Sequence, residues 1–226
     1  MWFGSRPEPG DDAAPGTCMS GSPSRPVTGL ILAGGLARRM GGGDKPLHML
    51  AGRPILAHVV ERLRGQCGRL LLNANGDPAR FAAYRLPVVA DTLAGFAGPL
   101  AGILAGLDWL AAERPGEDSL VSVAADTPFV PDDLVERLHA ARAAAGTPIA
   151  CATSGGRRHH AIGLWPVALR EDLRAALSAG ERRLGQWAGR HGVAVAEWPT
   201  EPLDPFFNIN TPADLAEAER LIRSPR

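Results

Sequence analysis

In the stretch GLILAGGLARRMGGGDKPL, residues 29–47, a short apolar run is followed by five glycines, two arginines and a lysine. An apolar run that ends in glycines predicts a buried β-strand followed by a tight turn. Glycines directly after a strand allow backbone N–H groups to face a ligand without interference from a Cβ atom. Arg38, Arg39 and Lys45 add positive charge and hydrogen-bond donors. The stretch therefore predicts a strand that leads into a cradle for a triphosphate.

The spacing within this loop separates it from two common phosphate-binding motifs. No glycine-lysine pair followed by Ser or Thr occurs here, so the loop is not a Walker A motif. The G-x-G-x-x-G pattern of dinucleotide-binding folds is also missing. A glycine-rich surface turn with solvated charges is the simpler alternative. Five glycines and three cations directly after a buried strand favour the phosphate cradle.

Hydrophobic periodicity beyond the loop predicts strands that alternate with helices. Such alternation indicates a three-layer, Rossmann-like α/β fold, with a mostly parallel sheet covered by helices on both faces. A less regular region follows residue 155, and it ends in a helix with Thr211 as N-cap, Pro212 in the first turn and Asp214 as the third helical residue. The apolar runs predict strands over 27–33, 69–75, 86–91, 119–126, 148–154 and 193–199; the helical patterns cover 54–68, beginning at Pro54, and 78–85, 98–116, 130–146 and 167–180.

Composition limits the class of protein. The 226 residues suit one domain over 27–226, after residues 1–26, whose Pro, Gly, Ser and Asp content predicts a disordered extension. Lys plus Arg equals Asp plus Glu at 24 each, which argues against a nucleic-acid-binding protein. Three cysteines without a C-x-x-C pair, no apolar leader and no apolar span predict a cytoplasmic protein without a membrane segment.

Polar residues follow the predicted strands where each one ends. Asn73 and Asn75 follow the second strand, Asp91 the third and Asp126 the fourth. In open parallel sheets, ligands bind beyond the carboxyl ends of the strands, so these side chains are candidates for the site. Each also has a structural alternative: the asparagines could form turns, Asp91 could cap the loop at Thr92, and Asp126 could cap the following turn.

The loop, together with several later blocks, resembles one family. It is similar to nucleotidyltransferases that open with an LAGG…RMG…DK signature, and specifically to the molybdenum cofactor guanylyltransferases. The blocks LLLNAN, VVAD, GPLAGILAGL, DTPF, GERRL and NINTPADL stand in the order and at the spacing of that family, from residue 28 to about residue 221. The resemblance implies that GTP and the phosphate of molybdopterin, with or without molybdenum, condense to a guanine dinucleotide cofactor and pyrophosphate.

The resemblance also implies roles for individual residues. The nucleotide-binding positions it implies are Leu32, Ala33, Gly34, Gly35, Lys45, Asn73, Asp91 and Asp126. Within these, Lys45 matches a phosphate-binding lysine and Asp126 matches a Mg²⁺ ligand, a role that suits a carboxylate beside substrate phosphates. Lys45, Asp126 and Arg39 are the expected catalytic residues.

The second substrate has a less defined set of candidates. Asn208 and Asn210 match residues on the pterin or phosphate side of the family's active site. Arg183 could bind phosphate or begin a solvated helix, and His160 is a candidate contact beside Ala161, where the family pattern has proline. His159 and His160 are adjacent in a predicted extended segment, so their side chains should point in opposite directions.

Three other functions stay open at this point: cytidylyl transfer to the same pterin, nucleotidyl transfer to a sugar phosphate, and a pterin carrier without catalysis. The LAGG block favours guanine, because relatives that use CTP tend toward LAAG. Lys45 and Asp126 argue against a carrier, which has no use for a metal-binding triphosphate site. Proteins of molybdoenzyme maturation are further expected partners.

Overall fold

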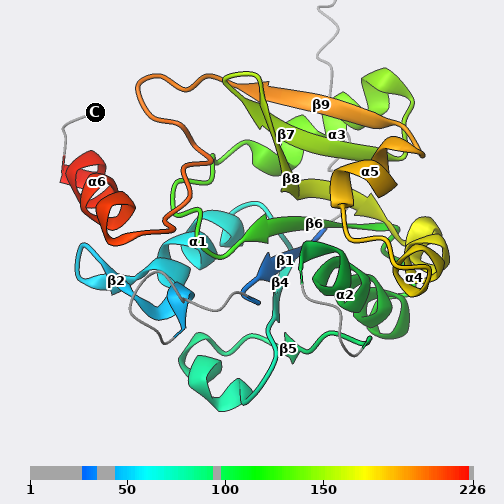
Figure 1. Cartoon of the computed structure of the whole chain (residues 1–226), viewed down its shortest axis with the longest axis horizontal. Helices are drawn as coiled ribbons and strands as arrows, with labels where there is room; N and C mark the ends of the chain where they lie inside the picture. The colour runs from blue at the N-terminus through cyan, green and yellow to red at the C-terminus, as the bar shows by residue number, and fades with distance from the viewer. Residues whose placement is uncertain (1–26, 35–43, 94–97, 224–226) are drawn as a thin grey trace, which may run out of the picture.

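The computed structural model describes residues 27–34, 44–93 and 98–223. Its centre is a seven-stranded sheet in the order β5-β4-β1-β6-β8-β7-β9 (Figure 1). All neighbouring strands pair in parallel except β8, which is antiparallel to both β6 and β7. The prediction of a mostly parallel sheet is confirmed. The strands are β1 (Thr28–Leu32), β4 (Arg69–Asn73), β5 (Val88–Val89), β6 (Ser119–Ala124), β7 (Ile149–Ser154), β8 (Arg157–Pro166) and β9 (Val193–Trp198).

Helices cover both faces of the sheet, so the predicted three layers are also confirmed. On one face, α1 (Ile55–Arg64) and α3 (Leu134–Ala145) pack their apolar residues against the strands. On the other face lie α2 (Pro99–Glu113), α4 (Arg170–Ser178) and α5 (Leu184–Gly189). Two large apolar clusters, one on each face, supply most of the buried area that stabilises the fold.

The last helix, α6 (Pro212–Arg223), lies apart from these layers and beside β2 (Met49–Leu50) (Figure 1). It begins as predicted. The N–H of Thr211 donates to Oδ2 of Asp214 (2.8 Å), and the N–H of Asp214 donates to Oγ1 of Thr211 (3.2 Å). These reciprocal bonds form a capping box that satisfies the first turn of the helix.

Two local predictions differ from the structure. Pro54 is the N-cap of α1 rather than its first helical residue, because it belongs to β3 (Arg53–Pro54), which pairs with β2 in a short hairpin. The helix predicted over 78–85 is the 3₁₀ helix η2 (Pro78–Tyr84). Two further short 3₁₀ helices are η1 (Lys45–Leu47) and η3 (Val167–Leu169). In the described ranges, no helix combines the length and apolarity needed to cross a bilayer.

The strand directions decide where a ligand can bind. Because β5, β4, β1 and β6 are parallel neighbours, their carboxyl ends lie along one edge of the sheet. Leu32 at the end of β1 pairs with Asn73 on one side and with Ala124 on the other. The residues that follow these strands are therefore neighbours in space.

Candidate active site

A cavity of about 540 Å³ opens at this carboxyl edge. Its wall joins the ends of β1, β4 and β6 to the start of η1 and the first turn of α2. Some of the residues that line the cavity were predicted from the sequence, and others were not. The lining consists of Leu32, Ala33, Gly34, Asp44, Lys45, Pro46, Asn73, Asn75, Arg80, Asp91, Gly98, Pro99, Ala124, Ala125, Asp126 and Ala161.

Lys45 connects two separate parts of the site. Its Nζ forms an ion pair with Oδ2 of Asp126 and also donates to Oδ1 of Asn210 at 2.7 Å. The two charged side chains are largely buried, with 13% of Lys45 and 19% of Asp126 exposed. A single ammonium group thus joins the residue after β6 to the segment that precedes α6.

The carboxylate of Asp126 is not used to cap a turn. Thr127 makes the local turn bond, since its Oγ1 donates to the carbonyl of Ala124 at 2.6 Å. The main-chain oxygen of Asp126 accepts the N–H of Ile209 at 3.0 Å, which fixes this position against the 208–210 segment. Its Oδ1 atom is buried and has no hydrogen-bond partner in the described part of the chain.

An unsatisfied carboxylate oxygen beside a cavity of about 540 Å³ fits a cation site. Buried acceptors without partners are costly and call for a physical reason. A divalent cation held by one carboxylate and by substrate phosphates would supply the missing partner. Asp126 therefore fits the role of a metal ligand.

Asp91 is held by Asn73, the last residue of β4, and by Asn75, two residues further on. Nδ2 of Asn73 donates to Oδ1 of Asp91 at 3.0 Å, and Nδ2 of Asn75 donates to Oδ2 at 2.7 Å. Asn73 is buried, with 4% of its surface exposed, and helix α2 packs against it. A Cβ atom on Gly102 of that helix would lie 2.3 Å from Oδ1 of Asn73, so this close approach requires glycine. The three polar residues form one fixed cluster in the cavity wall.

The structure describes only part of the glycine-rich segment over 29–47. Leu32, Ala33 and Gly34, the predicted nucleotide contacts, line the cavity. Gly35, Arg38 and Arg39 lie outside the described residues, as does the extension over 1–26. Two charged cavity residues were not singled out from the sequence: Asp44, which directly precedes Lys45, and Arg80 of η2, whose Nε lies 3.3 Å from Oδ2 of Asp44. A signal for Asp44 was its place in the Asp-Lys pair of the opening block.

The four candidate residues for a second substrate do not line this cavity. Asn210 reaches it through its bond to Lys45, and Oδ1 of Asn208 is buried without a partner among the described residues. His160 and Arg183 lie together at the start of α5. A Cβ atom on Gly185 would be 2.4 Å from Cε1 of His160, and Arg183 is the N-cap residue of the same helix.

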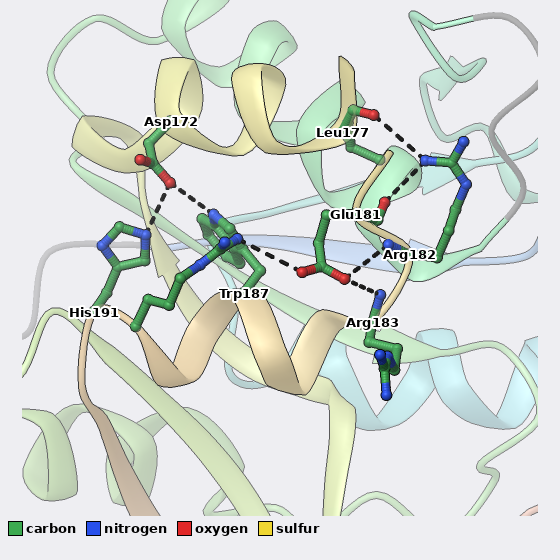
Figure 2. A network of polar contacts seen from close by, with 8 residues as sticks. Asp172, Leu177, Glu181, Arg182, Arg183, Trp187 and His191 are labelled. Carbon is green, nitrogen blue, oxygen red and sulfur yellow. Dashed lines mark hydrogen bonds and ion pairs between the residues drawn. The ribbon is translucent and has the colours of Figure 1, made fainter. Parts of the chain in front are cut away.

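The two arginines before α5 differ in their contacts. Figure 2 shows the carboxylate of Glu181 accepting the backbone N–H groups of Arg182 and Arg183, both at 2.9 Å. These bonds lower the pKa of Glu181, and the bond from the N–H of Arg183 has the largest effect. The guanidinium of Arg182 donates to the carbonyls of Leu177 and Glu181. That of Arg183 points away from Glu181 and has no hydrogen bond or ion pair within the described ranges.

His159 and His160 point in opposite directions along β8, as predicted. His159 is buried, and its Nε2 lies 2.8 Å from Oγ of Ser154. That hydroxyl donates to Oδ1 of Asp204 at 2.8 Å. Burial lowers the pKa of His159, against an opposing influence from Asp204. Burial followed by the nearby Arg158 charge lowers the pKa of His160.

The chain matches known proteins over most of its length. A family model described as a MobA-like NTP transferase domain covers residues 29–195. A molybdenum cofactor guanylyltransferase from Bradyrhizobium sp. (strain ORS 278) is 62% identical over 204 residues, which are 90% of this chain and 96% of that protein. A protein of the same name from Rhodopseudomonas palustris (strain BisB5) is 56% identical over 204 residues, with the same coverage.

Among solved structures, the molybdopterin-guanine dinucleotide biosynthesis protein A of Archaeoglobus fulgidus has the same fold. The TM-score is 0.68 at 26% identity, covering 87% of this chain and 98% of that one. Fold, site and relatives together define a nucleotidyltransferase. The chain belongs to the MobA-like NTP transferase family, which confirms the resemblance seen in its sequence blocks.

Proposed function

We propose that this enzyme transfers GMP from GTP to the terminal phosphate of molybdopterin, releasing pyrophosphate and a guanine dinucleotide. The observation that carries the proposal is the pairing of Lys45 with Asp126 at one end of a cavity lined by Leu32, Asn73 and Asp91. The names of relatives at 56–62% identity support guanine and molybdopterin as the substrates.

The reaction needs positioning and charge neutralisation more than a strong base. The terminal phosphate of the pterin attacks the α-phosphorus of GTP in line, and the bond to the leaving pyrophosphate breaks. A phosphate monoester is already largely dianionic near neutral pH, so it needs no residue to remove a proton before attack. Catalysis then depends on groups that hold the triphosphate and stabilise developing charge.

The residues divide these tasks by their charge and place. Lys45 holds phosphate oxygens of the triphosphate and stabilises the leaving pyrophosphate. Asp126 holds Mg²⁺, which when bound supplies positive charge to the phosphate oxygens. Arg39 is a further proposed phosphate contact. Leu32, Ala33, Gly34, Gly35, Asn73 and Asp91 are the proposed contacts of the nucleoside.

The acceptor is proposed to bind on the other side of Lys45, toward Asn208 and Asn210. Arg183, at the start of α5, is a separate proposed contact of the acceptor phosphate, because its guanidinium makes no ion pair in the described ranges and phosphate is a natural partner for arginine. His160, a further proposed contact, packs against Gly185 of α5 and is one residue from the cavity-lining Ala161.

We propose that the enzyme works in the cytoplasm. Proteins of molybdoenzyme maturation would take up its product. Cys67 and Cys151 are free thiols, and burial raises the pKa of each to about 12, so neither is a reactive thiolate. Free thiols suit the reducing cytoplasm. We also propose residues 27–226 as the catalytic domain and 1–26 as an extension outside it.

A nucleotide panel tests the proposal. GTP, CTP, ATP and UTP are each incubated with Mg²⁺, with and without molybdopterin, and pyrophosphate is measured. We expect release from GTP only when molybdopterin is present, and no Mg²⁺-free turnover. Turnover of CTP equal to or above that of GTP would refute guanylyl transfer. Release without any acceptor would indicate a hydrolase.

A further inference from the structure

Asn75 makes two bonds to Asp91. Its Nδ2 donates to Oδ2 of Asp91 at 2.7 Å, while its Oδ1 accepts the backbone N–H of Asp91 at 2.9 Å. Asn73 instead divides its Nδ2 between Oδ1 of Asp91 and the carbonyl of Val89, at 3.0 and 3.2 Å. Asn75 therefore fixes both the main chain and the carboxylate of Asp91, and Asn73 fixes the remaining oxygen.

Asn75 is itself held in place on its other side. Its backbone carbonyl accepts a hydrogen bond from the guanidinium of Arg80, which also pairs with Asp44 across the cavity wall. Asn75 is exposed and lines the cavity, so burial alone does not explain its contacts. Both polar atoms of the Asn75 side chain, Nδ2 and Oδ1, thus bond to Asp91, so this exposed asparagine supports that aspartate.

This support fixes the orientation of two acceptors. Each oxygen of an ionised carboxylate can accept two hydrogen bonds. The asparagine amides use one position on each oxygen of Asp91, which leaves one acceptor on each oxygen in a fixed plane. Among the described residues, Asp91 has no ion-pair partner within 4.0 Å that would compete for these positions.

Two adjacent acceptors match one edge of one nucleobase. Guanine carries N–H donors side by side at N1 and at its 2-amino group. The Watson–Crick edges of adenine and cytosine place an amino donor beside a ring-nitrogen acceptor, and that of uracil places one N–H between two carbonyls. A paired acceptor therefore selects guanine, because any other base leaves a polar group without a partner.

The position of Asp91 suits the base end of a nucleotide. It follows β5, whereas Asp126 follows β6, and the two strands are three places apart in the sheet. With neighbouring strands about 4.8 Å apart, their ends are separated by about 14 Å. Asp91 thus lies away from the phosphate end, where a second carboxylate without a cation would repel the triphosphate.

We propose that Asn75 is a positioning residue for guanine selection, which holds the Asp91 carboxylate toward N1–H and the 2-amino group of the base. This inference rests on the proposed function and assigns to Asn75 a role beyond the turn-forming one. Its specific consequence concerns inosine triphosphate, ITP, which keeps N1–H but lacks the 2-amino group.

Direct binding of GTP and ITP with Mg²⁺, measured by calorimetry, tests the inference without the pterin. The wild type should bind GTP more tightly than ITP by a factor of about 10 or more. Asn75→Ala should lower this ratio to less than about 3, mainly by weakening GTP. In an Asp91→Ala background, adding Asn75→Ala should leave the ratio unchanged, because Asn75 acts through Asp91.

Asp77→Ala is the matched control, since Asp77 lies in the same loop and caps η2 through the N–H of Ala79 without contacting Asp91. It should keep the wild-type ratio. An Asn75→Ala protein with an unchanged ratio, or an equal loss in Asp77→Ala, would overturn the inference and leave guanylyl transfer intact. So would a wild type that binds GTP and ITP equally. A wild type that binds no GTP would refute the proposed function itself.

Discussion

The ammonium group of Lys45 forms an ion pair with the carboxylate of Asp126, 81 residues further along the chain. The same ammonium group donates to Asn210, so it lies between the nucleotide side and the proposed acceptor side of the site. Lys45 neutralises the carboxylate that is the proposed Mg²⁺ ligand. The proposed metal would therefore bind a carboxylate whose other oxygen already faces a positive charge.

Asp126→Asn should lower turnover by about 100-fold or more at ordinary Mg²⁺, because the amide keeps the shape but loses the charge that attracts the cation. Part of the activity should return at high Mg²⁺, since phosphate oxygens still supply ligands. The free energy of unfolding should change by about 1 kcal/mol or less, as Asn still accepts a hydrogen bond from Lys45. A Mg²⁺ titration of turnover and thermal unfolding check both. Normal turnover in this variant would remove Asp126 from the metal site.

Lys45→Met should weaken binding of the triphosphate, and added Mg²⁺ should not restore it. Without nucleotide, the same variant should bind Mn²⁺ about tenfold more tightly or better, because Lys45 no longer neutralises Asp126. Electron paramagnetic resonance of free Mn²⁺ measures this directly. Arg53→Met removes an exposed positive charge paired with Glu61 and serves as the control. Unchanged Mn²⁺ affinity in Lys45→Met would show that lysine and metal do not compete.

Gly102→Ala should weaken GTP binding by about 10- to 100-fold, because the new Cβ would displace Asn73 from the cavity wall. Overpacking against Asn73 and Leu32 should also cost about 1–3 kcal/mol of stability, although alanine ordinarily favours a helix over glycine. Calorimetry and thermal unfolding measure the two effects. Gly189→Ala in α5 is the control, as its Cβ would meet nothing within 4 Å. Equal GTP binding by both variants would contradict the assigned role of Asn73.

Stability should fall as the pH drops below about 6.5, the ordinary pKa of histidine. Burial lowers the pKa of His139, His159 and His160 in the folded chain, so the unfolded chain binds protons more readily. The stability that these neutral histidines contribute is fully present above the pKa of the unfolded chain. It is lost as the pH falls through that pKa toward the lower pKa values of the folded chain. Melting temperatures from pH 8 to pH 5 should show this slope, and His159→Gln should flatten it. A slope that is the same in His159→Gln would assign it to other groups.

The order of elements could be predicted from the sequence because local patterns encode it. Apolar runs, glycine stops and the Thr211–Asp214 capping box depend on neighbours a few residues apart. The sequence also predicted that Asn73, Asp91 and Asp126 lie close together, since a parallel sheet gathers whatever follows its strands at one edge, and all three line one cavity. Lys45, predicted from the charged glycine-rich loop, lines the same cavity. The β2–β3 hairpin was missed, because two strands of two residues each are too short to show a period.

Pairings between distant segments required the tertiary structure. Lys45 with Asp126 and Asn210, Asp44 with Arg80, and His160 against Gly185 each join side chains from separate elements. Sequence spacing carries no information on such contacts, because the sheet and its crossovers set the distances. The role of Asn75 shows the difference. From the sequence alone, an asparagine at this position suggests a turn. Only the folded chain shows that its side-chain Nδ2 and Oδ1 both bond to Asp91.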